Sequence, residues 1–380
     1  MVDENANHSS TVVAQAAFTW KPTETLTITP SIFYQDIDIG DGNYFWEDLS
    51  NQNEGDFRNG NAVANTSTDR FVLPALAIEL DLGNAALFSN TSYFDRNQQA
   101  VNDYTAFESA LWTGSPYFAA GTFAPAFQTN KQQNFTQEIR LQSTNPDSRI
   151  DWVIGGFYSR NKQIAAQLVQ NTFLPDIIPL EVIFGRGLVD GLYTFVLDDA
   201  RSTDEQIAGF GQIDWHMTDT LTFTVGLRVS RTDFNIRAQF EGPVVGPDVD
   251  DRGQQSETPV TPKFGITYQP NEDHMFYGTV AKGFRIGGYN PAVGLPCGVS
   301  DGAPRPGTPL GNIGLSDRPA LFDSDTVWSY EVGSKNSLMD RRLNVEASAF
   351  YINWSNIQQS VGLQCGFSFT DNLGSATSKG

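Results

Sequence analysis

The sequence predicts an all-β fold, namely part of a transmembrane antiparallel up-and-down β-barrel. Short turns and long connections alternate along the chain, apolar and polar residues alternate within the predicted strands, and several strands run well beyond about 10 residues. The alternation alone would also suit a sandwich with one wet face. Sandwich strands are seldom so long, and a sandwich has no reason to place its long loops at one end.

Six hairpins with turns of a few residues follow one another along the chain. Their strand, turn and strand segments lie within residues 18–28, 76–88, 139–152, 210–223, 262–284 and 328–353. In the fifth hairpin, a turn rich in Pro, Asn and Asp at 269–274 separates strands at 262–268 and 275–284. The connections between hairpins run from roughly 15 to about 40 residues, which is the asymmetry typical of outer-membrane barrels.

The two-residue period is clearest in two of these strands. In one, Val345 and Ala347 share a face opposite Asn344 and Glu346; in the long strand at 221–240, apolar residues also occupy every second position. Such a strand fits a wall with lipid outside and water inside. Aromatic residues near many predicted strand ends, including Phe33, Phe94, Trp215 and Tyr268, would form the interfacial girdles of such a wall.

Composition excludes several other classes of protein. Charged residues make up 18% of the chain and aromatic residues 12%, a balance that argues against disorder. There is no unbroken apolar run of about 18 residues, so no spanning helix is predicted. The formal net charge of −20 repels phosphate backbones, and we therefore expect no nucleic-acid partner.

The strand count predicts a fragment. Six hairpins and a final segment at 367–380 give about 13 strands, whereas bacterial barrels have an even number. The first and last strands would then be bare edges. The start of the chain also has neither a basic segment nor an apolar one, so no signal peptide is predicted and we expect a truncated start.

Several strings of residues, taken in order and spacing, carry a family resemblance. Residues 283–290 read Gly-Phe-Arg-Ile-Gly-Gly-Tyr-Asn, residues 329–335 read Ser-Tyr-Glu-Val-Gly-Ser-Lys, and residues 349–358 read Ala-Phe-Tyr-Ile-Asn-Trp-Ser-Asn-Ile-Gln. With the earlier segments 135–141 and 152–158, these strings resemble the barrel of TonB-dependent receptors. The resemblance covers essentially the whole chain and is weakest in the loops.

The resemblance implies one domain, residues 1–380, that is part of a barrel of about 22 strands without its plug or last strands. It implies location in the outer membrane of a Gram-negative bacterium, with lipid around the wall. Its partners would be the TonB complex, reached through the missing N-terminal region, and a small-molecule ligand such as a siderophore. The expected function is import of a scarce nutrient, foremost a ferric siderophore or similar iron complex. A passive porin and a soluble carbohydrate-binding β-sandwich are the alternatives.

The residues show no pattern that supports catalysis. His8, His216 and His274 lie far apart, and neither a Gly-x-Ser-x-Gly elbow nor a Walker loop is present, so we expect no enzyme activity, cofactor or metal site. The acidic runs at 36–38 and 248–251 fall in predicted loops. They are interpreted as solvated loop tips, with a calcium site as the alternative.

The two cysteines support an expectation about the long loops. Alternating turn length places Cys297 and Cys365 on the same, extracellular side, in loops that flank adjacent strands. A disulfide between them is expected in that oxidising setting, where it would pin a long loop; two unpaired thiols are the alternative.

Candidate ligand contacts follow only from position on extracellular loops or the upper lumen wall. Arginines there could pair with an anionic iron chelate and aromatic rings could stack on the ligand, although each side chain could equally pack its own loop. The candidates are Arg285, Tyr289, Trp112, Tyr117, Phe123 and Arg186.

Overall fold

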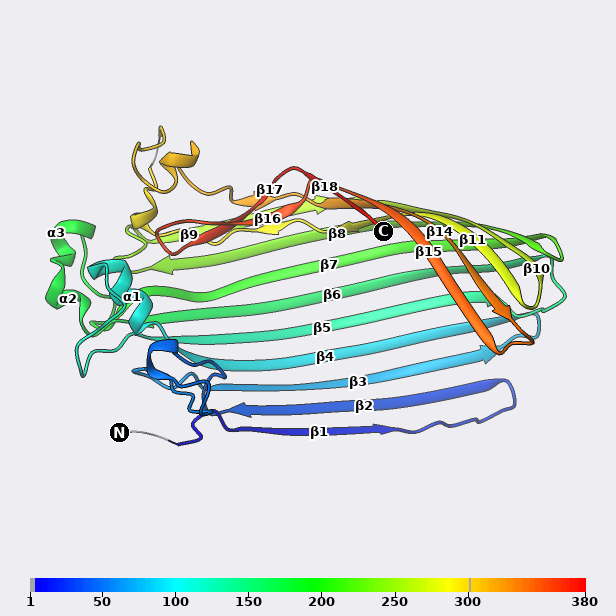
Figure 1. Ribbon diagram of the computed structural model, residues 1–380, viewed down its shortest axis with the longest axis horizontal. Coiled ribbons are helices and arrows are strands. Elements are labelled where there is room, and N and C mark those ends of the chain that lie inside the picture. Colours follow the sequence, from blue (N-terminus) through cyan, green and yellow to red (C-terminus); the bar gives the residue numbers. More distant parts are fainter. Residues whose placement is uncertain (1–3, 301) are drawn as a thin grey trace.

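The computed structural model describes residues 4–300 and 302–380 and consists mainly of one large antiparallel sheet (Figure 1). Thirteen of its strands follow the order β1-β2-β3-β4-β5-β6-β7-β8-β10-β11-β14-β15-β18, and a further strand, β9, pairs with β8. The predicted fold class and the count of about 13 strands are therefore confirmed. One continuous sheet also contradicts the sandwich alternative, which required sub-domains of about 100 residues.

The strands of this sheet are β1 (Ser9–Ala17), β2 (Leu26–Ile39), β3 (Ser67–Asp81), β4 (Ala85–Asp103), β5 (Pro125–Ser143), β6 (Ile150–Gln170), β7 (Tyr193–Thr218), β8 (Leu221–Glu241), β9 (Val249–Glu257), β10 (Val260–Asn271), β11 (His274–Arg285), β14 (Asp325–Leu338), β15 (Leu343–Ser355) and β18 (Ser375–Lys379). Two short hairpins stand apart from it, β12 (Gly288–Tyr289) with β13 (Leu321–Phe322), and β16 (Gln358–Gly362) with β17 (Ser368–Asn372).

The connections at the two ends of the sheet differ in length, except that segment 242–248, which leads into β9, is about as short as segment 18–25 at the opposite end (Figure 1). The segments that close hairpins, at 18–25, 82–84, 144–149, 219–220, 272–273 and 339–342, share one end, called here the turn end. The segments 40–66, 104–124, 171–192, 242–248, 286–324 and 356–374 share the other, called the loop end. This is the predicted asymmetry.

The loop end carries the helices of the described chain: α1 (Thr105–Thr113), α2 (Leu174–Ile177), α3 (Leu180–Phe184) and three single 3-10 turns, η1 (Glu47–Leu49), η2 (Leu295–Cys297) and η3 (Gly311–Ile313). The sequence did not predict them. Within residues 4–300 and 302–380, no helix combines the length and the apolar character needed to cross a bilayer.

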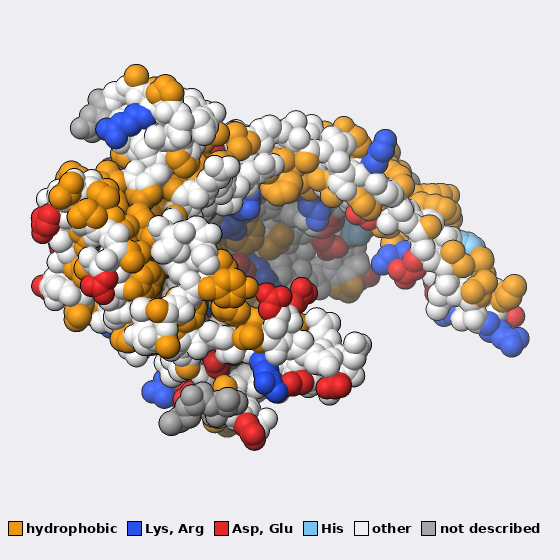
Figure 2. All heavy atoms as spheres, turned by 60° about the vertical axis from the view of Figure 1, so that its left-hand side comes forward, with side chains coloured by type: hydrophobic (Ala, Val, Ile, Leu, Met, Phe, Trp, Pro, Cys, Tyr) orange, Lys and Arg blue, Asp and Glu red, His pale blue; other side chains and the backbone are white. Residues whose placement is uncertain are grey.

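The two faces of the sheet differ in chemistry because successive side chains along a strand point to opposite sides. One cross-strand row on the outer face contains Ile154, Gly211 and Leu227, and the apolar side chains of that row are about half exposed. The neighbouring row on the inner face contains Arg140, Phe210 and Arg228. The sheet curves around a hollow in which charged side chains are visible (Figure 2). An apolar exterior and a charged interior are typical of a membrane barrel wall.

The wall is unequal in height. β7 has 26 residues and β8 has 21, whereas β10 and β11 have 12 each. β9 continues the line of β10 beside the upper part of β8, and among the described residues its backbone pairs with β8 alone. The tall side therefore runs from β4 to β9, and the low side from β11 to β15.

Two expectations about strand positions were wrong. The acidic runs do not lie at loop tips, because residues 36–38 belong to β2 and Asp250 and Asp251 belong to β9. Phe33 and Phe94 do not lie at strand ends either. They lie within β2 and β4, and Phe71 of β3 is close to both, with ring centroids 5.5 Å from Phe33 and 5.2 Å from Phe94. These three rings pack against one another on the inner face, away from an interfacial girdle.

Candidate ligand-binding face at the loop end

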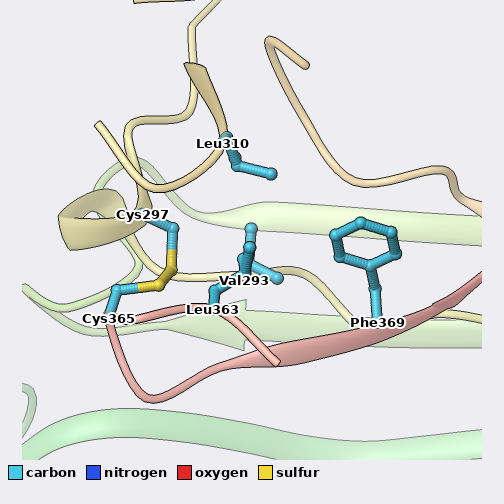
Figure 3. Packing of buried hydrophobic residues seen from close by; sticks show 6 residues of the cluster. All are labelled: Val293, Cys297, Leu310, Leu363, Cys365 and Phe369. Carbon is cyan, nitrogen blue, oxygen red and sulfur yellow. A yellow bond between two sulfur atoms is a disulfide. The ribbon is translucent and has the colours of Figure 1, made fainter. Parts of the chain in front are cut away.

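The largest structure at the loop end is formed by two connections, residues 286–324 and 356–374, called here the disulfide-linked loop pair. Cys297 and Cys365 are joined by a disulfide with a Cα–Cα distance of 5.2 Å. Around it pack the buried side chains of Val293, Leu310, Leu363 and Phe369 (Figure 3). Because each segment contributes to this cluster, neither can be displaced without exposing apolar surface of the other.

Buried polar contacts fasten this loop pair to the inner face of β9. The guanidinium of Arg318 is 8% exposed and pairs with the carboxylate of Asp251. The Tyr289 hydroxyl donates a hydrogen bond to the same carboxylate, at 2.6 Å. Burial, followed by this contact with Asp251, raises the pKa of Tyr289, so its hydroxyl remains a donor at neutral pH. The loop pair therefore lies over the hollow and not outside it.

Arg285 marks the point where β11 enters this loop pair. Its guanidinium is 2.5 Å from the buried carboxylate of Asp325 and donates to the carbonyl oxygen of Gln358 at 3.3 Å. The same group stacks on Trp354, 5.5 Å from the ring centroid. Arg285 thus links β14, β15 and the hairpin β16–β17, while about half of its side chain stays exposed.

A second structure, called here the helical loop pair, is formed by residues 104–124 and 171–192. Its centre is Glu108 on α1, which accepts hydrogen bonds from Trp112 Nε1 at 2.6 Å and from Asn171 Nδ2 at 3.2 Å. Burial raises the pKa of Glu108, although both hydrogen bonds act in the opposite direction. Trp112 also packs edge-on against Phe184 of α3, with ring centroids 5.7 Å apart. The two loops therefore share one small core.

The remaining candidates differ in how freely they face solvent. Tyr117 is 68% exposed and Phe123 is 40% exposed, and both lie on the helical loop pair. Arg186 pairs with Asp248 and donates to the carbonyl oxygen of Gly246 at 3.3 Å, which ties the helical loop pair to the β8–β9 connection. Of the six predicted contacts, Tyr117 and Phe123 are thus the least engaged within the protein.

The structure therefore divides the predicted residues into two groups. Trp112, Tyr117, Phe123 and Arg186 lie on the helical loop pair, and Arg285 and Tyr289 on the disulfide-linked loop pair. The groups adjoin, because the ring of Phe107 on α1 lies against Gly366. Both loop pairs also contact Gly246 of the β8–β9 connection, one through the Leu295 side chain and the other through Arg186.

Sequence reasoning missed the residues that organise these loops. Glu108, Asp251 and Arg318 act through partners far along the chain, and their identity alone carries no such signal. Asp41, in the loop 40–66, is a further example. Burial alone would raise its pKa, but hydrogen bonds from the Asn65 and Gly42 backbone and from the Asn65 and Asn59 side chains hold the pKa of this carboxyl below its usual range.

Below the loops, charged side chains line the inner face of the sheet in paired or stacked arrangements. Arg96 and Asp69 form an ion pair at 2.5 Å. Arg228 stacks on Phe157, 4.9 Å from the ring centroid. A cavity of about 220 Å³ is lined partly by Glu79, Phe88, Glu138 and Arg140. In the part of the chain that the structure describes, no group of three or more His, Cys, Asp or Glu residues could hold a metal ion.

These features define a class of protein: a membrane barrel wall whose charged hollow is covered at one end by structured loops. The sequence pattern of the family described as "TonB dependent receptor-like, beta-barrel" matches residues 5–380, and the chain belongs to this family. The resemblance read from the sequence is thereby confirmed.

Known proteins agree with this membership. The ferric yersiniabactin uptake receptor FyuA from Yersinia pestis superposes with a TM-score of 0.71 at 14% identity, over 98% of this chain and 48% of that chain. The siderophore receptor PiuA from Acinetobacter baumannii gives 0.63 at 16% identity, over 98% and 53% respectively. The pesticin receptor of Yersinia enterocolitica is 24% identical over 179 residues, which are 47% of this chain and 23% of that protein. The chain thus spans about half the length of the solved structures that it matches, and these likenesses establish the fold alone.

Proposed function

We propose that the protein to which this chain belongs imports a scarce nutrient across the outer membrane, foremost a ferric siderophore or similar iron complex, with energy supplied through TonB. The supporting observation is the cover of structured loops at the loop end. Two structured loop pairs, one of them fastened by the disulfide and by the Arg318–Asp251 pair, lie over a charged hollow. A mouth covered in this way suits capture of a bound ligand better than free diffusion of many solutes.

Family membership and the nature of the neighbours support the same proposal. FyuA is a ferric yersiniabactin uptake receptor and PiuA a siderophore receptor. By extension, residues 1–380 are part of one barrel domain, its outer face contacts lipid, and the TonB complex is its energising partner. No catalytic step is proposed for this chain.

For ligand contact we propose the exposed aromatic side chains Tyr117 and Phe123, together with Trp112 of the same loop. Aromatic rings can stack on flat groups of an iron chelate, and these two rings are exposed, although the Tyr117 hydroxyl donates a long hydrogen bond to Asp48 at 3.5 Å. The other three predicted contacts, Arg285, Tyr289 and Arg186, already have partners within the protein. Their proposed contribution is to hold the loops in the ligand-binding arrangement. The arginine N–H groups and the tyrosine ring surface that these partners leave free could still contact the ligand.

The proposal is tested by radioactive iron uptake in cells that lack their own siderophore receptors and express the whole gene. Ferric yersiniabactin is the first probe and ferric citrate the second. Uptake that disappears when TonB is deleted supports the proposal. Uptake that continues without TonB would establish a passive porin, and absence of uptake with functional TonB for both probes and a wider siderophore panel would overturn the assignment to iron.

The same assay examines the ligand contacts. Tyr117→Ala and Phe123→Ala should each raise the iron-complex concentration needed for half-maximal uptake by roughly 5- to 20-fold, the range expected for losing one stacked ring. Phe18→Ala removes an aromatic residue at the turn end that is about as exposed as Tyr117, and it should leave uptake unchanged. Equal effects of all three variants would refute the assignment of these contacts.

A further inference from the structure

The outer face of the wall carries an unusual row of positive charge near the loop end. The pairing registers place Lys131 of β5, Ile164 of β6, Arg201 of β7, Arg237 of β8 and Arg252 of β9 directly side by side on five consecutive strands. This row is called here the arginine row. Neighbouring strands lie about 4.8 Å apart, so the backbone positions of Arg201 and Arg252, two strands apart, are separated by roughly 10 Å across the sheet.

Such a row works against folding unless something offsets it. Like charges directly opposite each other on neighbouring strands destabilise a sheet. The chain as a whole carries a net charge of −20, with only 24 Lys and Arg residues, so four cations in one row are a strong local concentration.

The carboxylates nearby offset this charge only in part. Asp199 contacts Arg201, Asp198 lies near enough to act on the same guanidinium, and a single carboxylate, Asp250, is shared by Arg237 and Arg252. All three arginine side chains are more than half exposed. Exposed ion pairs of this kind contribute little stability and exchange readily for a stronger anion. Three guanidinium groups therefore keep N–H donors available to a ligand.

The height of the row selects the kind of anion. The apolar outer face ends on β7 at Ile207, and Arg201 lies six residues further toward the loop end, which is three rows of outward-facing side chains. Three rows are about 20 Å along a strand, or about 15 Å in height for a strand tilted by about 40°. The headgroup layer of a bilayer leaflet is only about 5–8 Å thick. The phosphate of an ordinary phospholipid would therefore lie below the row.

From this geometry we propose that the arginine row binds phosphate groups on the sugar portion of an outer-leaflet glycolipid. The sugars of such a lipid stand above the membrane interface, at the height of the row, and spacing over three strands suits two phosphate groups. Lys162, one row below Arg201 on the neighbouring strand, continues the positive surface toward the membrane, whereas Arg160, two rows below, pairs with Glu205. The proposal rests on the proposed membrane placement of the wall but not on the nutrient.

The test uses the receptor expressed from its whole gene, purified in nonionic detergent, with lipopolysaccharide carrying a phosphorylated core as the probe. The variant R201Q/R237Q/R252Q should bind it at least tenfold more weakly. The matched control R58Q/R149Q/R341Q removes the same charge from exposed arginines in the loop 40–66 and at the turn end, and should bind like the unchanged receptor. Each variant is first checked for a folded barrel by its heat-dependent mobility in gels.

Further probes separate the sources of phosphate. Lipopolysaccharide stripped of its phosphates, lipid A without core sugars, and inorganic phosphate should each compete at least tenfold less well than the intact probe. Equal binding by the two triple variants would mean that the row is an ordinary solvated rim and would overturn the proposal. Equal competition by lipid A or by inorganic phosphate would overturn its assignment to the sugar phosphates. Iron uptake is measured in parallel, so that loss of transport is not mistaken for loss of glycolipid binding.

Discussion

Removing the disulfide should loosen the disulfide-linked loop pair while leaving the wall intact. The variant C297A/C365A deletes the cross-link without leaving a free thiol. Cys297 lies 12 residues beyond the end of β11 and Cys365 lies 10 residues beyond the end of β15, and β14 holds those two strand ends close together. With the wall folded, the cross-link therefore closes a loop of about 22 residues, well short of its 68-residue separation in sequence.

A loop of that length corresponds to about 3 kcal/mol of chain entropy, which is on the order of a hundredfold in the opening equilibrium. The buried cluster around Leu310 and Phe369 remains, so the loops should open more often but should still close.

Hydrogen–deuterium exchange of the detergent-solubilised receptor measures this opening. Amides bonded within the loop pair, such as Leu310 N–H to the Cys297 carbonyl and Leu363 N–H to the Phe367 carbonyl, should exchange roughly a hundredfold faster in the variant. Peptides from β5 and β6 act as the internal control and should not change. An increase of less than about threefold in the loops would show that packing alone holds the loop pair closed, and an equal increase in β5 and β6 would show that the cross-link stabilises the whole wall.

Three further predictions concern other parts of the chain. Burial raises the pKa of Glu108 above its ordinary 4.5, so the helical loop pair should be most stable below about pH 4.5 and should lose stability as pH rises through the raised pKa. Glu108→Gln should flatten this pH dependence, measured by tryptophan fluorescence. A profile unchanged by the substitution would contradict the role of Glu108. Ile213→Arg on the outer face should lower the stability of the barrel in the membrane by about 2–4 kcal/mol and reduce its assembly, whereas Gln212→Arg on the inner face should assemble normally. Equal assembly of the two variants would refute the assignment of the two faces. Arg318→Met should lower the free energy of opening the disulfide-linked loop pair by about 3 kcal/mol, because Asp251 loses its buried partner. Hydrogen–deuterium exchange measures this loss, and adding Asp251→Asn should restore most of the lost stability.

The strands were predictable wherever one face is apolar. In β8, apolar side chains at every second position from Leu221 to Val229 gave both the strand and its orientation. The same reasoning failed for β9, whose sequence Val-Asp-Asp-Arg-Gly-Gln-Gln-Ser-Glu has no apolar face. That segment is a strand because the upper part of β8 extends beyond β10 and its backbone groups need a partner, and the length of a neighbour is a tertiary property that no local pattern records.

The candidate site was predictable only in outline. Alternating turn lengths placed Cys297 and Cys365 on the same side, and that much follows from counting strands. The burial of Glu108 depends on Asn171, which lies 63 residues away, and the role of Arg318 depends on Asp251, 67 residues away. Neither partner has a fixed spacing or motif, so the folded chain was needed to find them.

The unequal height of the wall gives the mouth of the hollow a direction. β7 exceeds β11 by 14 residues, or roughly 45 Å along the strands, so the rim is cut obliquely and is lowest where β11, β14 and β15 end. The disulfide-linked loop pair is attached at that low rim and leans across toward β9. A swing about its own attachment points would open the mouth sideways, breaking the contacts of Arg318 and Tyr289 with Asp251 but leaving the backbone pairing of the large sheet intact. Solutes would then arrive from the flank of the molecule, and the tall strands opposite would stop them.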